Sequence, residues 1–427
     1  MALASHVQMD KQYGYGINWR NTSMAVNSKL GFTRFLLAIA LATMSTLLWC
    51  VTASVEAADE TENTSPVAEM GPYDRLLDPE PLEQLGLDIL WTTDVTTSDT
   101  PQLLGNMLYV VSPKNEIHAL DSQTGKELWV YPLQAPLDFP LAAGKDTVCA
   151  ISTNRLHIID LESGIGKLKG LLPFAASTGP APTKQGVWIM GWDGVLYRMA
   201  AMRYGALGGI SVHSTVWDDS FREEKLGNVR VNASVKVNAK ITVPVIIADG
   251  NLILLDNTGM VQALESHTRE HSWERTVDTK GSIRSMPAIG EGMMYVGSDS
   301  YRVAAINTQT GDQVWRVLMQ GPFDRPLYVL KDGPVLASAT NDRLAALAPA
   351  NGEELWSVPQ GLGPVAASET EVIVEVQDKG IVSIDIATGQ VAWENRAQEV
   401  EAFVPNASSP ILYMLTGNGI TAVGPAN

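Results

Sequence analysis

The sequence predicts an all-β fold, an eight-bladed β-propeller of four-stranded antiparallel blades, because three markers repeat along it about every 40 residues. The first marker is a proline that opens a strand, found at Pro101, Pro140, Pro180, Pro244, Pro287, Pro326, Pro364 and Pro405. The second is a polar hairpin turn, found at Asn115, Asn154, Asp193, Thr258, Asp299, Asn341, Lys379 and Asn418. The third is a turn glycine followed four residues later by a tryptophan. The first two series each count eight units.

The strands of each unit follow from the residues between these markers. The clearest copies have an apolar run, a polar turn, a second alternating run and a Thr-Gly or Asn-Gly turn before the tryptophan, and they occupy residues 107–131, 293–317, 335–358 and 372–395. Proline cannot donate to a sheet ladder, so the strand that it opens is predicted to be the innermost edge strand, which lines the channel. Pairs such as Asp193-Gly194 supply the positive φ that a two-residue hairpin turn needs.

Six tryptophans are predicted to bury their flat rings between neighbouring blades and so to dock one blade on the next. They are Trp91, Trp129, Trp273, Trp315, Trp356 and Trp393. The second and third units have Leu168 and Gly209 at the equivalent position. The sequence therefore predicts that the interfaces after these two units pack less well.

The two ends of the repeat region are predicted to share one blade. The last unit has no fourth strand after residues 411–427, whereas residues 86–95 match a fourth strand with its tryptophan and stand before the first unit. An N-terminal strand that completes the final blade would close the ring and remove an open sheet edge.

One spacing is irregular, because the third and fourth units lie about 24 residues further apart than the others. The excess falls in residues 214–240, which carry mixed charge and two aromatic side chains. Long loops on a rigid scaffold often bind partners, so Trp217, Phe221 and Arg222 are candidate partner contacts. The alternative is a plain surface excursion or an extra hairpin.

The N-terminus is predicted to be a signal peptide or an N-terminal anchor, residues 1–57. Four basic residues precede an uncharged apolar run over residues 35–55, and small residues place a cleavage site near Ala57. An uncleaved anchor is the alternative, since about 20 apolar residues can span a bilayer. Lipidation of Cys50 is disfavoured because the bulky Trp49 precedes it.

Charge and cysteine content exclude several classes of protein. The chain has 30 Lys and Arg against 47 Asp and Glu, a net charge of −17, which disfavours nucleic-acid partners. Residues 58–86 are acidic and lack periodicity, and they are predicted to form a flexible tether. Two cysteines cannot build a disulfide scaffold. His267, Glu270 and His271 match a zinc-peptidase pattern, but they fall in a hairpin turn rather than on a helix, so no metal site is predicted.

The pattern A-x-D-x-x-T-G-x-x-x-W at residues 119–129, with near copies at 304–315, 345–356 and 382–393, resembles the pyrroloquinoline-quinone-type repeat. The resemblance covers most of the chain after the predicted tether. Proteins with this repeat include quinoprotein dehydrogenases and also non-enzymatic scaffolds, such as the outer-membrane assembly lipoproteins of the BamB type.

The resemblance implies an exported, non-enzymatic protein-interaction scaffold of the bacterial cell envelope, peripheral to or anchored at a membrane, with protein partners in outer-membrane protein assembly. The sequence lacks the adjacent cysteines of the alcohol dehydrogenase branch and a recognisable cluster of calcium-binding acids. No catalytic residue and no cofactor is therefore predicted. The alternatives are a pyrroloquinoline-quinone-dependent dehydrogenase that also binds calcium, and a propeller that binds a small ligand in its channel. The missing lipidation cysteine separates the chain from the lipoproteins as well.

Overall fold

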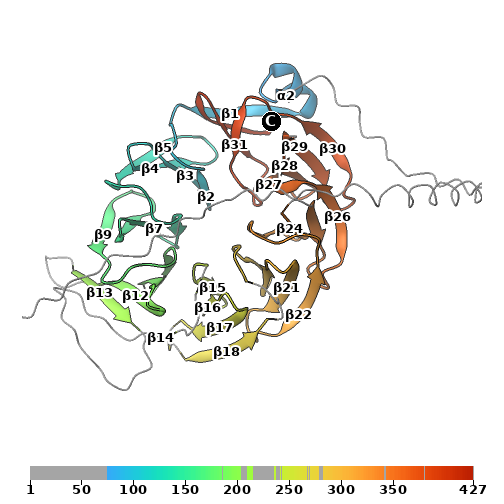
Figure 1. Ribbon diagram of the computed structural model, residues 1–427. Coiled ribbons are helices and arrows are strands. Elements are labelled where there is room, and N and C mark those ends of the chain that lie inside the picture. The colour runs from blue at the N-terminus through green and yellow to red at the C-terminus, as the bar shows by residue number, and fades with distance from the viewer. Residues whose placement is uncertain are drawn as a thin grey trace, which may run out of the picture. The chain divides into compact units, whose positions relative to one another are not determined.

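In the computed structural model, the described part of the chain forms a ring of eight antiparallel sheets (Figure 1). The sheets are the blades of a β-propeller, which confirms the predicted fold class. In every blade the first strand lies nearest the centre of the ring and the last strand at its outside (Figure 1). The structure describes residues 75–427 except 185, 203–208, 215–234, 237–240, 242, 267, 269, 278–281, 341–342, 379 and 427.

The first four blades follow one another along the chain. Blade 1 contains β2 (Gln102–Leu104), β3 (Met107–Val111), β4 (Glu116–Asp121) and β5 (Glu127–Pro132). Blade 2 contains β6 (Ala142–Ala143), β7 (Thr147–Ser152), β8 (Arg155–Asp160) and β9 (Gly166–Leu171). Blade 3 contains β10 (Ala181–Thr183), β11 (Gly186–Met190), β12 (Val195–Met202), β13 (Gly209–Ser214) and the short β14 (Val235–Lys236). Blade 4 contains β15 (Ile246–Ala248), β16 (Asn251–Leu255), β17 (Met260–Glu265) and β18 (His271–Thr276).

The other four blades complete the ring. Blade 5 contains β19 (Ala288–Gly290), β20 (Met293–Gly297), β21 (Arg302–Asn307) and β22 (Gln313–Leu318). Blade 6 contains β23 (Tyr328–Val329), β24 (Val335–Ser338), β25 (Arg343–Leu347) and β26 (Glu354–Pro359). Blade 7 contains β27 (Gly361–Ala367), β28 (Glu371–Val376), β29 (Gly380–Asp385) and β30 (Val391–Asn395). Blade 8 contains β31 (Val400–Phe403), β32 (Leu412–Thr416), β33 (Gly419–Pro425) and β1 (Leu87–Thr93).

Burial differs between the middle and the outer strands. Every residue of β16 is buried, because a middle strand has another blade on each of its two faces. In β22 only Trp315 is buried, and its neighbours point to solvent or to the rim. The apolar runs of the sequence therefore become the second strands of the blades, while the segments that carry the tryptophan after the turn become the outer strands.

The hairpin turns and most of the prolines lie where the sequence places them. Asn115 and Asn154 have positive φ, 60° and 55°, in the turns between the second and third strands of their blades. Asn341 and Lys379 lie outside the described residues. Six prolines stand directly before or within two residues of an innermost strand, but Pro364 lies inside β27.

Pro405 corrects the prediction, because it follows the innermost strand of blade 8 instead of opening it. The ladder of β31 with β32 covers Val400 to Phe403, and the Val404 amide still donates to the Tyr413 carbonyl at 3.0 Å. Pro405 has no N–H to continue this ladder, so it ends the strand.

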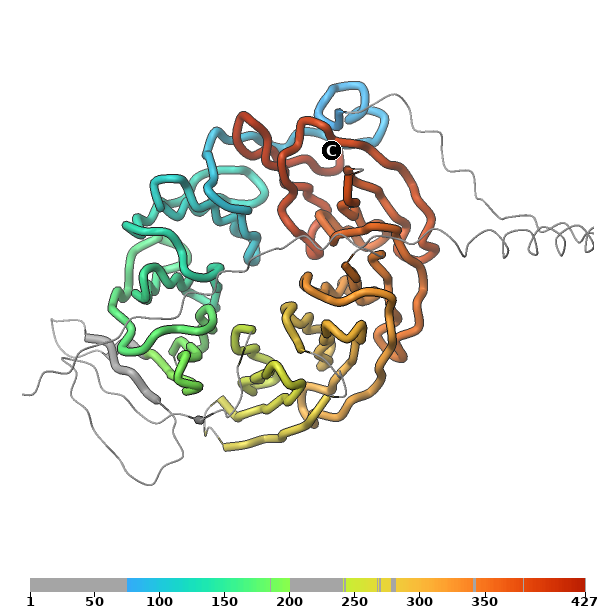
Figure 2. Tube along the Cα trace, in the orientation of Figure 1, coloured from blue at the N-terminus to red at the C-terminus, as the bar shows by residue number. Residues whose placement is uncertain are grey.

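The chain ends close the ring, as predicted. β1 pairs with β33 in antiparallel register, from Leu87 opposite Pro425 to Thr93 opposite Ile420. The N-terminal strand and the C-terminal strand therefore lie side by side (Figure 2).

The prediction of a flexible tether over residues 58–86 is wrong for residues 75–86. This stretch, which we call the strap, contains the helix α2 (Pro79–Leu85) and ends at Gly86 in a left-handed conformation. Leu76 and Leu82 of the strap are buried in one cluster with Phe403 of blade 8. The leucines give the strap apolar surface to bury, which outweighs its acidic composition. Residues 58–74 lie outside the described part.

Candidate interaction surfaces

Five of the six predicted tryptophans contact the next blade directly. Trp91 on β1 donates its indole N–H to the carbonyl of Ser122, in the turn between β4 and β5, at 3.0 Å. The same bond joins Trp129 to Leu161, Trp273 to Thr308, Trp315 to Pro349 and Trp356 to Ile386, at 2.9, 3.1, 2.7 and 2.8 Å. Each indole thus buries its ring and also satisfies its one polar atom.

Each of these five tryptophans docks on the turn glycine of the following blade. A Cβ atom on Gly125 would lie 2.4 Å from the Trp91 ring, and Gly125 also has φ 67°. The same holds for Gly352 against Trp315, at 2.6 Å and φ 75°. The Gly and Trp of one repeat therefore act in two different interfaces, because the glycine receives one ring and the tryptophan docks on the following glycine.

Trp393 is the exception, since it is only half-buried and belongs to the cluster that also holds the strap leucines. The third and fourth strands of blade 8, β33 and β1, come from opposite ends of the chain, so no short turn joins them. Four leucines of the strap belong to or pack against the same cluster: Leu76, Leu77, Leu82 and Leu85. The strap thus takes the place of the missing turn.

The second and third units have Leu168 and Gly209 in place of the docking tryptophan. Leu168 is buried and packs in one cluster with Val187 and Met199 of blade 3, so a smaller apolar side chain stands where six other blades have an indole. Gly209 begins β13. Looser packing after these units stays a prediction.

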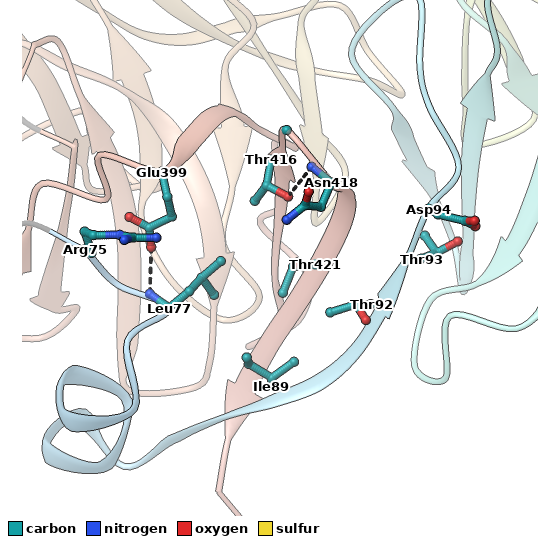
Figure 3. Close-up of a pocket in the computed structure, with 11 residues that line it drawn as sticks. Arg75, Leu77, Ile89, Thr92, Thr93, Asp94, Glu399, Thr416, Asn418 and Thr421 are labelled. Atoms are coloured by element: carbon teal, nitrogen blue, oxygen red, sulfur yellow. Dashed lines mark hydrogen bonds between the residues drawn. The ribbon is translucent and has the colours of Figure 1, made fainter.

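A polar groove borders the strap on blade 8 (Figure 3). It encloses about 690 Å³ between the strap, β1, the β32–β33 turn and the connection from blade 7. Glu399 of that connection accepts a hydrogen bond from the Leu77 amide at 2.6 Å, and Arg75 lies beside it (Figure 3). Its lining offers hydroxyl and carboxylate groups that can form hydrogen bonds, and Leu77 and Ile89 add apolar surface.

The two strands on either side of the excursion between the third and fourth units, β13 and β14, both pair with β12 of blade 3. Ser214, at the end of β13, pairs with Tyr197 of β12, and Val235 of β14 pairs with the adjacent Leu196. The predicted contacts Trp217, Phe221 and Arg222 lie outside the described residues. The two ends of the excursion therefore lie beside the start of β12, next to the β11–β12 hairpin. We call this region the base of the excursion.

That hairpin carries an exposed aromatic group which sequence analysis missed. Trp192 is 65% exposed, and close to it the rings of Phe174 and Tyr197 stack 3.8 Å apart at an angle of 9°. The Tyr197 hydroxyl donates a hydrogen bond to the Asp193 carboxylate at 2.5 Å. Burial raises the pKa of Tyr197, and the Asp193 carboxylate raises it further. The sequence signal that could have identified this group is a tryptophan directly before the Asp193-Gly194 turn. We call Trp192, Phe174 and Tyr197 the aromatic hairpin.

Quinone and calcium binding stays outside what the described residues show. They contain no group of three or more His, Cys, Asp or Glu side chains that could hold a metal ion. Five indoles are already committed to blade docking, and Trp188 is fully buried within the blades. Glu270 directly precedes β18 and His271 is its first residue, so neither lies on a helix, while His267 lies outside the described residues.

No helix in the described part of the chain has the length and apolar character needed to cross a bilayer. The predicted signal peptide or anchor, residues 1–57, lies outside that part.

Eight blades, indoles docked on turn glycines and a ring closed by both chain ends define a propeller of the pyrroloquinoline-quinone-type repeat class. Within this class the chain belongs to the family described as "Outer membrane protein assembly factor BamB", whose sequence model matches residues 87–193, 213–325 and 302–427.

Individual relatives carry both of the functions found in this repeat class. The protein named outer membrane protein assembly factor BamB of Yersinia pestis is 27% identical over 197 residues, 42% of this chain and 48% of that protein. The match thus spans about half the relative's length. A protein named 1-butanol dehydrogenase (cytochrome c) of Thauera butanivorans is 30% identical over 106 residues, 24% of this chain but 14% of that enzyme.

The fold is also that of a solved structure, BamB from Moraxella catarrhalis. It superimposes with a TM-score of 0.56 at 15% identity and covers 79% of this chain and 97% of that one. At this identity the likeness concerns the fold alone.

Proposed function

We propose that this chain is an exported, non-enzymatic scaffold of the bacterial cell envelope that binds protein partners of outer-membrane protein assembly. The observation that carries the proposal is the family match, which covers the described propeller apart from a stretch of blade 3 between residues 193 and 213. Residues 1–57 would export the chain, either as a cleaved signal peptide or as a retained anchor.

The geometry supports rigid display of binding surfaces. Indoles locked on turn glycines hold the blades against one another, so loops at the ring surface keep fixed relative positions. The outermost strand of a blade also has one edge without a neighbouring strand in its sheet, as β22 does. Such an edge can accept a partner strand through backbone hydrogen bonds.

The aromatic hairpin is the preferred contact surface. A solvent-exposed tryptophan with a rigid aromatic stack beside it is the kind of side-chain group that supplies most of the energy of a protein interface. It also stands at the base of the excursion, whose residues Trp217, Phe221 and Arg222 would extend the same surface. We therefore place the partner on blade 3.

A quinone-dependent dehydrogenase is the alternative function, and its support is the match to the butanol dehydrogenase. That match covers 14% of the enzyme, and no group of three or more His, Cys, Asp or Glu among the described residues could hold a metal ion. The proposed scaffold accordingly includes no quinone, calcium or catalytic residue, and no nucleic-acid partner.

Photo-crosslinking in the host envelope tests the proposal. A photoreactive amino acid replaces Trp192 in the full chain, and the matched control replaces Leu355, which is 52% exposed on blade 6. We expect the Trp192 position to yield an adduct with an outer-membrane assembly component and the Leu355 position to yield none. Adducts at neither position, or the same adducts at both, would contradict a partner on blade 3.

A further inference from the structure

Two grooves of opposite charge lie at the same end of the ring. Both are bordered by the turns that join the first and second strands of a blade, and these turns share one end in a propeller whose blades repeat in the same sense. One groove spans blades 2 to 4 and encloses about 990 Å³. We call it the lysine groove, lined among others by Lys145, Asp146, Lys167, Leu168, Lys184 and Ile247.

The lysine groove presents free positive charge. Lys167 is neutralised by Asp160, with 2.8 Å between nitrogen and oxygen. Lys145 and Lys184 are exposed, and among the described residues neither has a carboxylate partner. Asp146 is the single acidic residue in the lining. Two ammonium groups are therefore available to a ligand.

The lining of the lysine groove is also apolar in part. It includes Leu168, Val187 and Met199, and Ile247 at 43% exposure. Leu168 holds the position at which six other outer strands carry a tryptophan, so a smaller side chain contributes to the lining. A ligand that fits must combine negative charge with apolar groups.

The second groove shows that this charge is local. It spans blades 5 to 8, encloses about 1090 Å³, and is lined by Glu291, Asp332, Glu369 and Asp385. Its one lysine, Lys331, lies 3.9 Å from Glu369. The chain as a whole has 47 acidic and 30 basic residues, whereas residues 141–200 have four acidic and six basic ones. The lysine groove is thus a positive site on a negative protein.

We propose that the lysine groove binds an extended acidic polypeptide segment of a partner protein, with its carboxylates on Lys145 and Lys184 and its apolar side chains on the apolar part of the lining. A chain of net charge −17 is repelled from an anionic bilayer or a polyphosphate as a whole, whereas a short segment meets only the local field. The groove volume lies at the upper end of the range of small-ligand pockets, which suits a few residues of peptide. The proposal deepens the scaffold function by naming the chemistry of a partner, and it rests on that function.

Peptide binding to the purified full chain tests the assignment by fluorescence anisotropy. The probe is a labelled peptide in which Glu alternates with Val and Ser, and a second peptide has Lys in place of Glu. The test variant is Lys145→Glu with Lys184→Glu. The matched control is Lys114→Glu with Lys331→Glu, which changes the net charge equally at exposed turns outside the groove.

We expect the acidic peptide to bind the unmodified chain and the control alike, and to bind the groove variant about tenfold more weakly. Added salt should weaken binding, and the Lys peptide should not bind. Equal weakening in both variants, or no effect of the groove variant, would overturn the assignment. So would Lys145-dependent and Lys184-dependent binding to phosphatidylglycerol vesicles without peptide binding. Loss of the peptide result with intact crosslinks from Trp192 would reject the groove and leave the scaffold function standing.

Discussion

Trp315 and Gly352 form one contact across the interface of blades 5 and 6, so their substitutions should not be additive. Trp315→Ala should lower the free energy of unfolding by about 3–5 kcal/mol, since it removes a buried aromatic side chain. Gly352→Ala alone introduces a Cβ 2.6 Å from the ring at a positive φ. In the Trp315→Ala background the clash disappears, and only about 1 kcal/mol of backbone strain should remain.

Urea unfolding of the two single variants and the double variant measures this coupling. Trp192→Ala is the control, because its exposed ring should contribute within about 0.5 kcal/mol. Additive losses, or a loss below about 1 kcal/mol for Trp315→Ala, would contradict the docking role.

His157 should make stability depend on pH. Its side chain is fully buried, its Nδ1 lies 3.1 Å from the Tyr131 hydroxyl of blade 1, and burial, aided by the charges of Lys169 and Arg155, lowers its pKa to about 4. Below the unfolded value of about 6.5 the unfolded chain binds a proton that the folded chain does not. The stabilisation is therefore complete above about pH 6.5 and declines towards pH 4, by about 3 kcal/mol.

Unfolding midpoints measured between pH 7 and pH 4.5 should fall more steeply for the unmodified chain than for His157→Gln, which cannot titrate. Carboxylates such as Asp121, whose pKa is lowered by its hydrogen bonds with Thr124, contribute to the decline in both proteins. Parallel pH profiles would show that His157 is not the source.

At the scale of the element, the strap should stabilise the closing blade. Leu82→Ala removes a leucine that is 7% exposed in the cluster with Phe403 and Trp393, and should lower the free energy of unfolding by about 2–4 kcal/mol. Leu128→Ala, at a residue 43% exposed on β5, is the control and should have a smaller effect. Equal effects in urea unfolding would mean that the strap adds nothing to ring closure.

The repeating elements could be predicted because each repeat carries its own local chemistry. Turn pairs such as Asp193-Gly194 and the tryptophan after each turn glycine fix strand ends and outer faces without knowledge of distant residues. The pairing of the N-terminal strand with the C-terminal strand could be predicted by counting strands, because a closed ring needs a fourth strand in its last blade.

The parts that could not be predicted depend on contacts distant in sequence. A seven-residue helix is marginal alone, and α2 forms because Leu82 buries against strands more than 300 residues away. The lysine groove joins Lys145 and Lys184 of different blades, which no local pattern connects. Trp192 was missed because the local sequence around a turn does not determine whether the tryptophan there is buried or exposed.

At the scale of the whole molecule, we expect no quinone chemistry. Purified chain incubated with pyrroloquinoline quinone and Ca²⁺ should show no bound-quinone spectrum and no alcohol-dependent or sugar-dependent dye reduction, because the proposed scaffold function requires neither group. A purified quinoprotein dehydrogenase is the positive control. Quinone binding with dye reduction would contradict this expectation and would favour the alternative function, a dehydrogenase with its site in the channel.

The most direct test of the scaffold function is the abundance of β-barrel proteins in the outer membrane of host cells that lack this chain. Quantitative mass spectrometry of the envelope should show these proteins reduced, restored by the unmodified chain, and incompletely restored by Trp192→Ala, while soluble periplasmic proteins stay unchanged. Unchanged outer-membrane proteins in the deletion strain would contradict a role in their assembly.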